Sequence, residues 1–148
     1  MIKQEKKLNT LLIENGCTPI FLKGTGNLLA GLYEDVAERM VGDIDFIFSK
    51  EEYPKAITIL RDFGYSEVTK YEYYFPYDKH YRRLQKENNI AAIEIHSEIL
   101  GIEKYRKEFN YSVVEKDSQV INEVRVLGSV ALTLSKIKNT VFNTLLSN

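Results

Sequence analysis

The stretch VGDIDFIF, residues 41–48, contains two aspartates one residue apart inside an otherwise apolar run. Side chains alternate between the two faces of a strand, so Asp43 and Asp45 share one face while Ile44 and Phe46 share the other. Two carboxylates roughly 7 Å apart along a strand, beside an apolar layer, repel each other unless a cation joins them. Their oxygens suit a hard divalent cation such as Mg²⁺. The stretch therefore predicts a buried strand whose polar face is able to bind a metal ion.

A second stretch, AAIEIHSEI over residues 91–99, shows the same alternation. Ile93 and Ile95 share one face, and Glu94 and His96 share the other. If the two strands are neighbours, Glu94 adds a third carboxylate to the first two, and His96 is available to bind substrate or to orient Glu94. The alternative is structural: the two aspartates lie on a solvated face of the sheet, and His96 is a histidine with satisfied hydrogen bonds.

The remaining pattern predicts helices and strands around these two stretches. In chain order they are a helix over 4–15, a strand over 19–24, a helix over 26–33, the strand over 43–48, a helix that begins between Ser49 and Tyr53 and ends at Gly64, a strand over 65–75, a hairpin of 80–85 and 90–99 around the polar turn KENN, and a final helix over about 129–146. Residues 102–127 show no clear pattern. This order predicts an α/β or α+β fold, a mixed β-sheet with flanking helices.

Composition limits the classes of protein that need to be considered. The chain has 148 residues, which predicts one domain over 1–148, with 20 Lys+Arg against 21 Asp+Glu. This balance does not favour a polyelectrolyte binder of nucleic acid or anionic membrane. No apolar run approaches the roughly 20 residues of a membrane span, and we expect a cytoplasmic protein. Cys17 is the only cysteine, which excludes an internal disulfide, and we expect it to be a small buried apolar residue.

The order and spacing of several short motifs carry a family resemblance. The segment FLKGTGNLLAGLYEDVAERMVGDIDFIF (residues 21–48), with Glu94 as a third acidic residue on a later strand, resembles the nucleotidyltransferase fold of the DNA polymerase beta superfamily. More narrowly, LKGT, LYEDVAERMVGDIDFIF, FGY (63–65) and IEIH (93–96) look like the motifs of uncharacterised bacterial nucleotidyltransferases. The resemblance covers residues 20 to about 100. Relatives usually continue into a longer carboxy-terminal part.

The resemblance implies a role for eight residues. Asp43 and Asp45 would hold the Mg²⁺ ion bound to the triphosphate. The same two aspartates, together with Glu94, would hold a second ion on the acceptor side. Gly24 and Thr25 would bring backbone N–H groups and a hydroxyl to the phosphates at a helix start. The other candidate binding residues are Lys23 and Arg39, as partners of phosphate charge, and His96. Lys23 and Arg39 have an alternative as ordinary surface cations.

The segment KYEYYFPYDKHYRR, residues 70–83, combines five tyrosines with lysines and arginines that include Arg83. These aromatic and cationic side chains suit stacking with the ring of a base or of an acceptor. The alternative, an aromatic strand packed on the sheet and followed by an ordinary hairpin, is favoured for most of these tyrosines.

These features predict a magnesium-dependent nucleotidyltransferase. It would move a nucleoside monophosphate from a nucleoside triphosphate, such as ATP, to an unidentified acceptor and release pyrophosphate; the acceptor would be a small molecule, a protein or an RNA end. The alternative is a non-catalytic nucleotide-binding or partner-binding module on the same fold. A metal-dependent nuclease ranks last. It would give no role to the turn KGT (residues 23–25), which precedes the predicted helix over 26–33.

Overall fold

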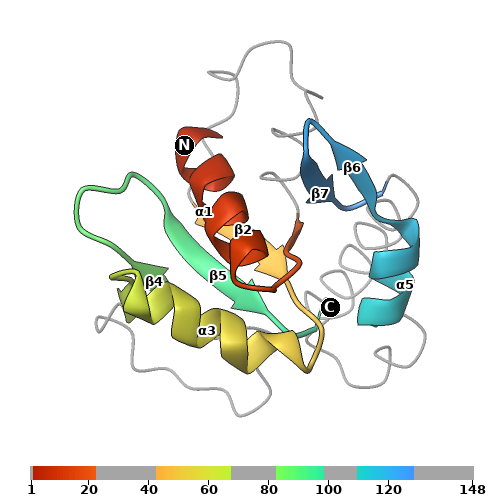
Figure 1. Cartoon of the computed structure of the whole chain (residues 1–148), viewed down its shortest axis with the longest axis horizontal. Coiled ribbons are helices and arrows are strands. Elements are labelled where there is room, and N and C mark those ends of the chain that lie inside the picture. Colours follow the sequence, from red (N-terminus) through yellow and green to blue (C-terminus); the bar gives the residue numbers. More distant parts are fainter. Residues whose placement is uncertain (1, 23–42, 68–82, 99–109, 129–148) are drawn as a thin grey trace, which may run out of the picture.

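The computed structural model describes residues 2–22, 43–67, 83–98 and 110–128 (Figure 1). Three predicted elements lie wholly or mostly outside these ranges: the helix over 26–33, most of the strand over 65–75 and the final helix over about 129–146. The prediction that residues 1–148 form one domain stays a prediction.

Within the described ranges, seven strands form one sheet in the order β3-β4-β5-β2-β1-β7-β6. The strands are β1 (Ile20–Phe21), β2 (Asp43–Ile47), β3 (Ser66–Glu67), β4 (Leu84–Gln85), β5 (Ala92–His96), β6 (Gln119–Ile121) and β7 (Val124–Val126). β2 runs parallel to β5, and β1 runs parallel to β7, while the other neighbouring pairs are antiparallel. The predicted mixed sheet is therefore confirmed, and its central strands are the two that carry the acidic motifs.

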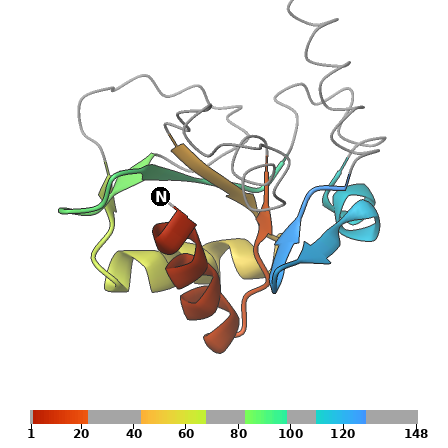
Figure 2. The same cartoon turned by 90° about the horizontal axis from the view of Figure 1, so that it is seen from above.

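Three helices accompany the sheet in the described ranges: α1 (Ile2–Glu14), α3 (Glu52–Asp62) and α5 (Tyr111–Asp117). Figure 2 shows α1 and α3 on the same side of the sheet. Asn110 caps the start of α5, because its side chain accepts a hydrogen bond from the N–H of Val113 (3.3 Å). Residues 102–127 show no clear pattern in the sequence, so α5, β6 and β7 are additions to the predicted elements.

The start of α3 resolves a conflict in the sequence. Ser49 and Glu52 predict a capping box, but Pro54 would then lie in the second turn of the helix. Ser49 Oγ does accept a hydrogen bond from the N–H of Glu52 (3.2 Å), and the helix begins at Glu52. Pro54 therefore lies in the first turn, where its missing N–H removes no helical hydrogen bond. The Glu52 carboxylate does not complete the box, because it accepts from the N–H of Thr18 (3.0 Å).

Both α1 and α3 end at a glycine with positive φ. Gly16 (φ 81°) follows α1, and Gly64 (φ 107°) follows α3. After α3, the N–H of Tyr65 donates to the carbonyl of Leu60 (3.1 Å), and the N–H of Gly64 donates to the carbonyl of Arg61 (3.0 Å). This is the Schellman arrangement, which requires a residue in the left-handed region. Gly64 is the residue at which the sequence predicts that α3 ends, and Gly16 directly follows the helix that it predicts over 4–15.

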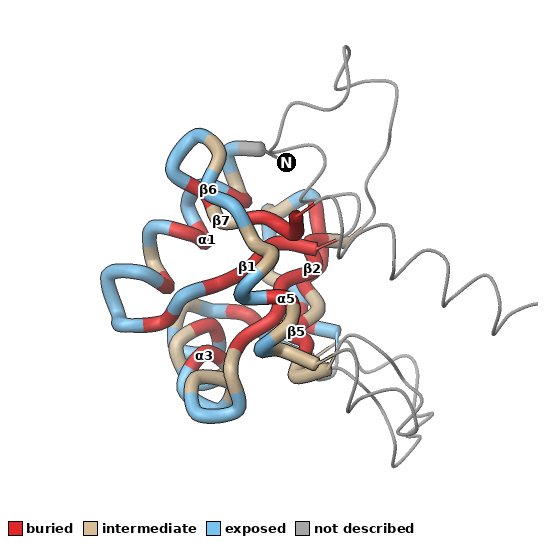
Figure 3. Tube along the Cα trace, turned by 90° about the vertical axis from the view of Figure 1, so that its right-hand side faces the viewer, coloured by how far each residue is buried: buried red, intermediate tan, exposed pale blue. Residues whose placement is uncertain are grey.

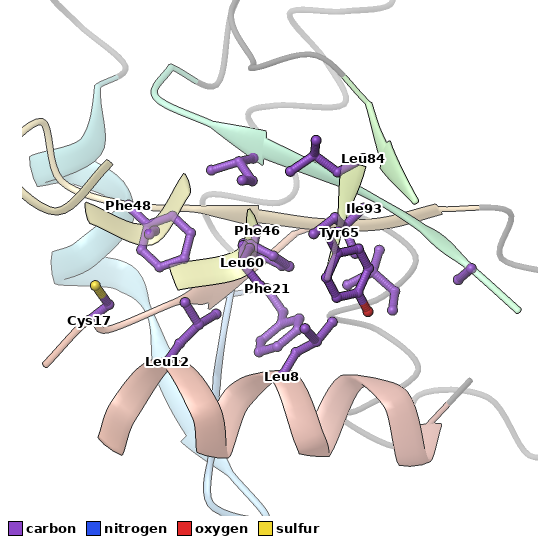
Figure 4. Close-up of a cluster of buried hydrophobic side chains, with 14 of the residues drawn as sticks. Leu8, Leu12, Cys17, Phe21, Phe46, Phe48, Leu60, Tyr65, Leu84 and Ile93 are labelled. Carbon is purple, nitrogen blue, oxygen red and sulfur yellow. The ribbon is translucent and has the colours of Figure 1, made fainter. Parts of the chain in front are cut away.

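The larger hydrophobic core lies between the sheet and the helices α1 and α3 (Figure 4). The Phe46 ring meets the Phe21 ring edge-on, with centroids 5.6 Å apart, and it meets the Phe48 ring in the same way at 5.3 Å. Leu8 and Leu12 point from α1 toward these rings. Figure 3 shows buried positions along β1, β2 and β5. The predicted apolar face of residues 43–48 is therefore confirmed.

The opposite face of the sheet carries a smaller apolar cluster. Its buried members are Ile20, Leu22, Ile47, Val114 and Leu127. Val114 belongs to α5, so α5 covers part of this face. Because side chains alternate along β2, Ile47 shares this face with the two aspartates. The polar residues of β2 and β5 therefore lie beside a small apolar cluster rather than on a fully solvated surface.

The position of Cys17 agrees with the role expected from the sequence. Cys17 is buried in the larger core, and burial raises the pKa of its thiol, which suits the expected apolar packing role.

Among the helices of the described ranges, none combines the length and apolar character that crossing a membrane requires.

Glu5, on α1, is a buried carboxyl group whose two oxygens have no hydrogen-bond partner in the described part of the chain. Burial raises the pKa of Glu5 from 4.5 to about 7. The folded protein therefore keeps a proton that the unfolded chain releases, so the free energy of unfolding falls as the pH rises from about 4.5 to about 7. We expect Glu5→Gln to remove this loss of roughly 2–3 kcal/mol, as measured by urea unfolding across that pH range.

Glu14→Gln is the matched control, because Glu14 is an exposed glutamate on the same helix. Its unfolding free energy should follow the wild-type pH dependence. Parallel curves for Glu5→Gln and wild type would show that Glu5 holds no extra proton in the folded protein.

Candidate active site

Asp45 and Glu94 are direct neighbours on the two central strands. β2 and β5 run parallel, and their register pairs Asp45 with Glu94 and Ile44 with Ile93. Paired residues on neighbouring strands lie on the same face, and the two isoleucines belong to the core beneath α1 and α3. Asp45 and Glu94 therefore share the opposite face, which is the arrangement that the sequence predicts.

His96 contacts both carboxylates from the same face. Its Nε2 lies 2.9 Å from Asp45 Oδ1 and 3.7 Å from Glu94 Oε2. The first distance is a hydrogen bond between buried side chains, since His96 is 1% exposed and Asp45 is 8% exposed. Of the two roles that the sequence suggests for His96, orienting a carboxylate agrees with this geometry, and the carboxylate in question is Asp45 more closely than Glu94.

These three side chains fit a metal ion. Asp45, Glu94 and His96 each offer one ligand atom, and the three atoms lie within 4.8 Å of one another. Ligands on opposite sides of an Mg²⁺ ion lie about 4 Å apart, because each bond is about 2.1 Å long. Small side-chain adjustments would therefore allow one ion to bind all three. Carboxylate oxygens suit Mg²⁺, and an imidazole nitrogen widens the choice to transition metals such as Mn²⁺.

Asp43 lies outside this group of ligands. It shares the polar face of β2 with Asp45, but its Oδ1 accepts a hydrogen bond from Nη2 of Arg83, and the two side chains form an ion pair. The structure thus brings Asp45 and Glu94 together with His96, while the third predicted carboxylate is engaged by an arginine.

The remaining predicted binding residues, Lys23, Gly24, Thr25 and Arg39, lie outside the described residues. The structure does describe the backbone that leads into them. The N–H of Leu22 donates to the carbonyl of Asp45 (2.9 Å), continuing the antiparallel pairing of β1 with β2. The chain therefore leaves β1 directly beside the acidic strand.

Arg83 is a charged residue of this face for which the sequence predicts no partner. In the sequence it is one of several cations in the segment 70–83. The alternation around the buried Leu84 puts Arg83 on the polar face, and this signal was available in the sequence.

Known proteins resemble this chain in sequence family and in fold. The model of a family described as uncharacterised nucleotidyltransferase matches residues 1–143. The crystal structure of a protein from Thermotoga maritima, assigned as a nucleotidyltransferase, is similar with a TM-score of 0.67. It is 11% identical, and the match covers 99% of this chain and 88% of that one. At this identity the likeness shows the fold alone, and it confirms the predicted fold class. No curated protein matches the chain.

Proposed function

The chain belongs to the uncharacterised nucleotidyltransferase family, and from that premise we propose that it transfers a nucleoside monophosphate from a nucleoside triphosphate to an acceptor. The observation that carries this proposal is the pairing of Asp45 with Glu94, with His96 beside both, on one face of the central strands. Carboxylates this close repel each other and favour a cation between them. The products are the nucleotidylated acceptor and pyrophosphate.

Asp45 and Glu94 are the proposed ligands of a divalent ion, Mg²⁺ by the chemistry of the carboxylate donors. Such an ion supplies positive charge where the transition state of nucleotidyl transfer is rich in negative charge. His96 holds the Asp45 carboxylate in orientation through its hydrogen bond. We also assign to the Glu94 carboxylate the acceptance of the proton that the attacking hydroxyl loses.

Asp43 is the third proposed carboxylate ligand. It shares a face with Asp45, and Arg83 competes with a metal ion for its carboxylate. We therefore propose that Asp43 joins Asp45 at the ion that arrives with the triphosphate, while Asp45 and Glu94 are already paired before that ion binds.

The phosphates would be bound by the backbone at Gly24 and Thr25, with Lys23 and Arg39 as charge partners. The hydrogen bond between Leu22 and Asp45 supports this proposal, because Lys23 directly follows Leu22 in the chain. A loop that leaves a strand beside a metal site is suited to hold the phosphates of a nucleotide whose metal ion binds there.

A triphosphate screen tests the proposal. We expect wild-type protein with Mg²⁺ to bind at least one nonhydrolysable nucleoside triphosphate in calorimetry. With the hydrolysable form and a panel of hydroxyl acceptors, including RNA ends, it should release pyrophosphate. Asp45→Asn keeps the side-chain size but removes ligand charge, so triphosphate affinity should fall at least about tenfold.

The outcomes separate the candidate functions. Binding and transfer support the enzyme. Binding that depends on Asp45, with no transfer to any acceptor, favours the alternative of a nucleotide-binding module. If wild type binds no triphosphate with Mg²⁺ or Mn²⁺, the nucleotidyltransferase proposal is wrong.

A further inference from the structure

Arg83 reaches across β5 on the polar face to pair with Asp43 at the start of β2. It directly precedes β4, and β5 lies between β4 and β2 in the sheet. Leu84 pairs with Ile93 across β4 and β5, and both are buried in the core beneath α1 and α3. The preceding residue, Arg83, therefore lies on the polar face and level with Glu94. Its guanidinium passes over β5 and donates to Asp43 on β2.

Ala92 has only a methyl side chain on the part of β5 that lies level with Asp43. In the register of β2 and β5, Ala92 pairs with Asp43 and shares the face of Glu94, two residues further along β5. A methyl group at this position leaves room above the strand for the aliphatic part of the arginine. Among the described residues of β2, β5 and the segment that leads into β4, Arg83 is therefore a cation beside Asp43 and level with Glu94.

The ion pair between Arg83 and Asp43 is partly exposed to solvent. The side chain of Arg83 is 45% exposed, and that of Asp43 is 27% exposed. Ion pairs between exposed side chains contribute little to stability, so opening this pair is inexpensive compared with the gain from binding a triphosphate. The arginine is therefore available to exchange its carboxylate partner for another anion.

We propose that Arg83 is a phosphate-binding residue that pairs with Asp43 only while the site holds no nucleotide. This inference rests on the proposed nucleotidyl transfer. When the metal ion and triphosphate bind, the Asp43 carboxylate turns to the ion, and the guanidinium of Arg83 turns to the phosphate oxygens. Arginine suits this exchange, because its planar fork of N–H donors binds carboxylates and phosphates with the same geometry.

This role predicts effects of opposite sign on two ligands. Without nucleotide, Arg83 competes with a metal ion for Asp43, so Arg83→Gln should bind Mn²⁺ alone more tightly, by about two- to fivefold. With a nonhydrolysable triphosphate and Mg²⁺, the same variant loses a charge-assisted contact, so its affinity should fall about tenfold or more. Calorimetry on the full chain measures both affinities without relying on turnover.

Two further variants make the test specific. Arg61→Gln is the matched control, because Arg61 forms an exposed ion pair with Glu67 of comparable exposure, and this variant should change neither affinity. Arg83→Lys keeps the charge but loses the fork, so its triphosphate affinity should fall between those of wild type and Arg83→Gln. It also serves as the test variant if the glutamine variant does not fold.

Each outcome has one meaning. Tighter metal binding together with weaker triphosphate binding supports the exchange. Unchanged affinities, or a parallel loss of both, would mean that Arg83 only connects strands, while the proposed function stands as long as wild type binds the triphosphate. If wild type itself binds no triphosphate, the proposed function and the role of Arg83 are both wrong.

Discussion

Glu94→Gln is expected to lower nucleotidyl transfer about a thousandfold and to leave the fold intact. Glutamine keeps the size of the side chain but removes the charge that helps to bind a metal ion beside Asp45. A loss of ~4 kcal/mol of transition-state stabilisation corresponds to roughly a thousandfold in rate. The fold should survive, because removing one of two crowded carboxylates relieves repulsion in the metal-free protein. Steady-state pyrophosphate release and a thermal unfolding curve measure the two effects.

Glu87→Gln is the control for this prediction. Glu87 is exposed in the turn between β4 and β5, so the same chemical change is made in the same hairpin but away from the site. Its turnover should stay near that of wild type. Triphosphate affinity should also fall more for Asp45→Asn than for Glu94→Gln, because Asp45 binds the ion that carries the nucleotide. Wild-type turnover in Glu94→Gln would mean that Glu94 holds no catalytic ion.

The central part of the fold follows from patterns that are local in the sequence. Alternation in residues 43–48 is enough to assign the two faces of β2, and Gly16 and Gly64 mark the ends of α1 and α3. The segment from α5 to β7 had no such signal. Its helix has seven residues and its two strands have three each, so none is long enough to establish a period.

Local patterns in the sequence also predict part of the candidate site. Alternation alone gives the faces of Asp45, Glu94 and His96, but their proximity depends on β2 and β5 being neighbours in a fixed register, which is a property of the whole sheet. The partner of Asp43 cannot be predicted from local patterns, because it depends on the register between β4 and β5. The turn KENN, closed by a hydrogen bond from Asn89 to Lys86 (3.2 Å), would by itself pair Leu84 with residue 91.

In the structure, Leu84 instead pairs with Ile93, two residues further along. A shift of two residues keeps every side chain on its face but changes its neighbours. Arg83 thereby becomes level with Glu94, and no local signal in the hairpin indicates the shift. Asp43, the partner of Arg83, lies on β2, which is one strand beyond β5. The pairing of Arg83 with Asp43 therefore depends on the order of β4, β5 and β2 in the sheet.

Phe46→Ala is expected to destabilise the protein by about 3–5 kcal/mol, the largest effect on stability that we predict. Phe46 is fully buried on β2 and meets two other phenylalanine rings edge-on, so alanine would leave a cavity at the centre of the larger core. For a chain of this length, the loss corresponds to a fall of roughly 10 °C in Tm. Thermal unfolding followed by circular dichroism measures it.

Phe46→Leu is the control, because leucine fills most of the volume and should cost clearly less. The position of Phe46 also predicts what happens to activity. Its side chain points to the face opposite Asp45, so at a temperature well below its Tm the alanine variant should bind triphosphate with nearly wild-type affinity. Glu94→Gln should show the reverse, intact stability with lost turnover. If Phe46→Ala instead lost triphosphate binding while still fully folded, the two faces of β2 would not be independent, and the site would depend on core packing beneath it.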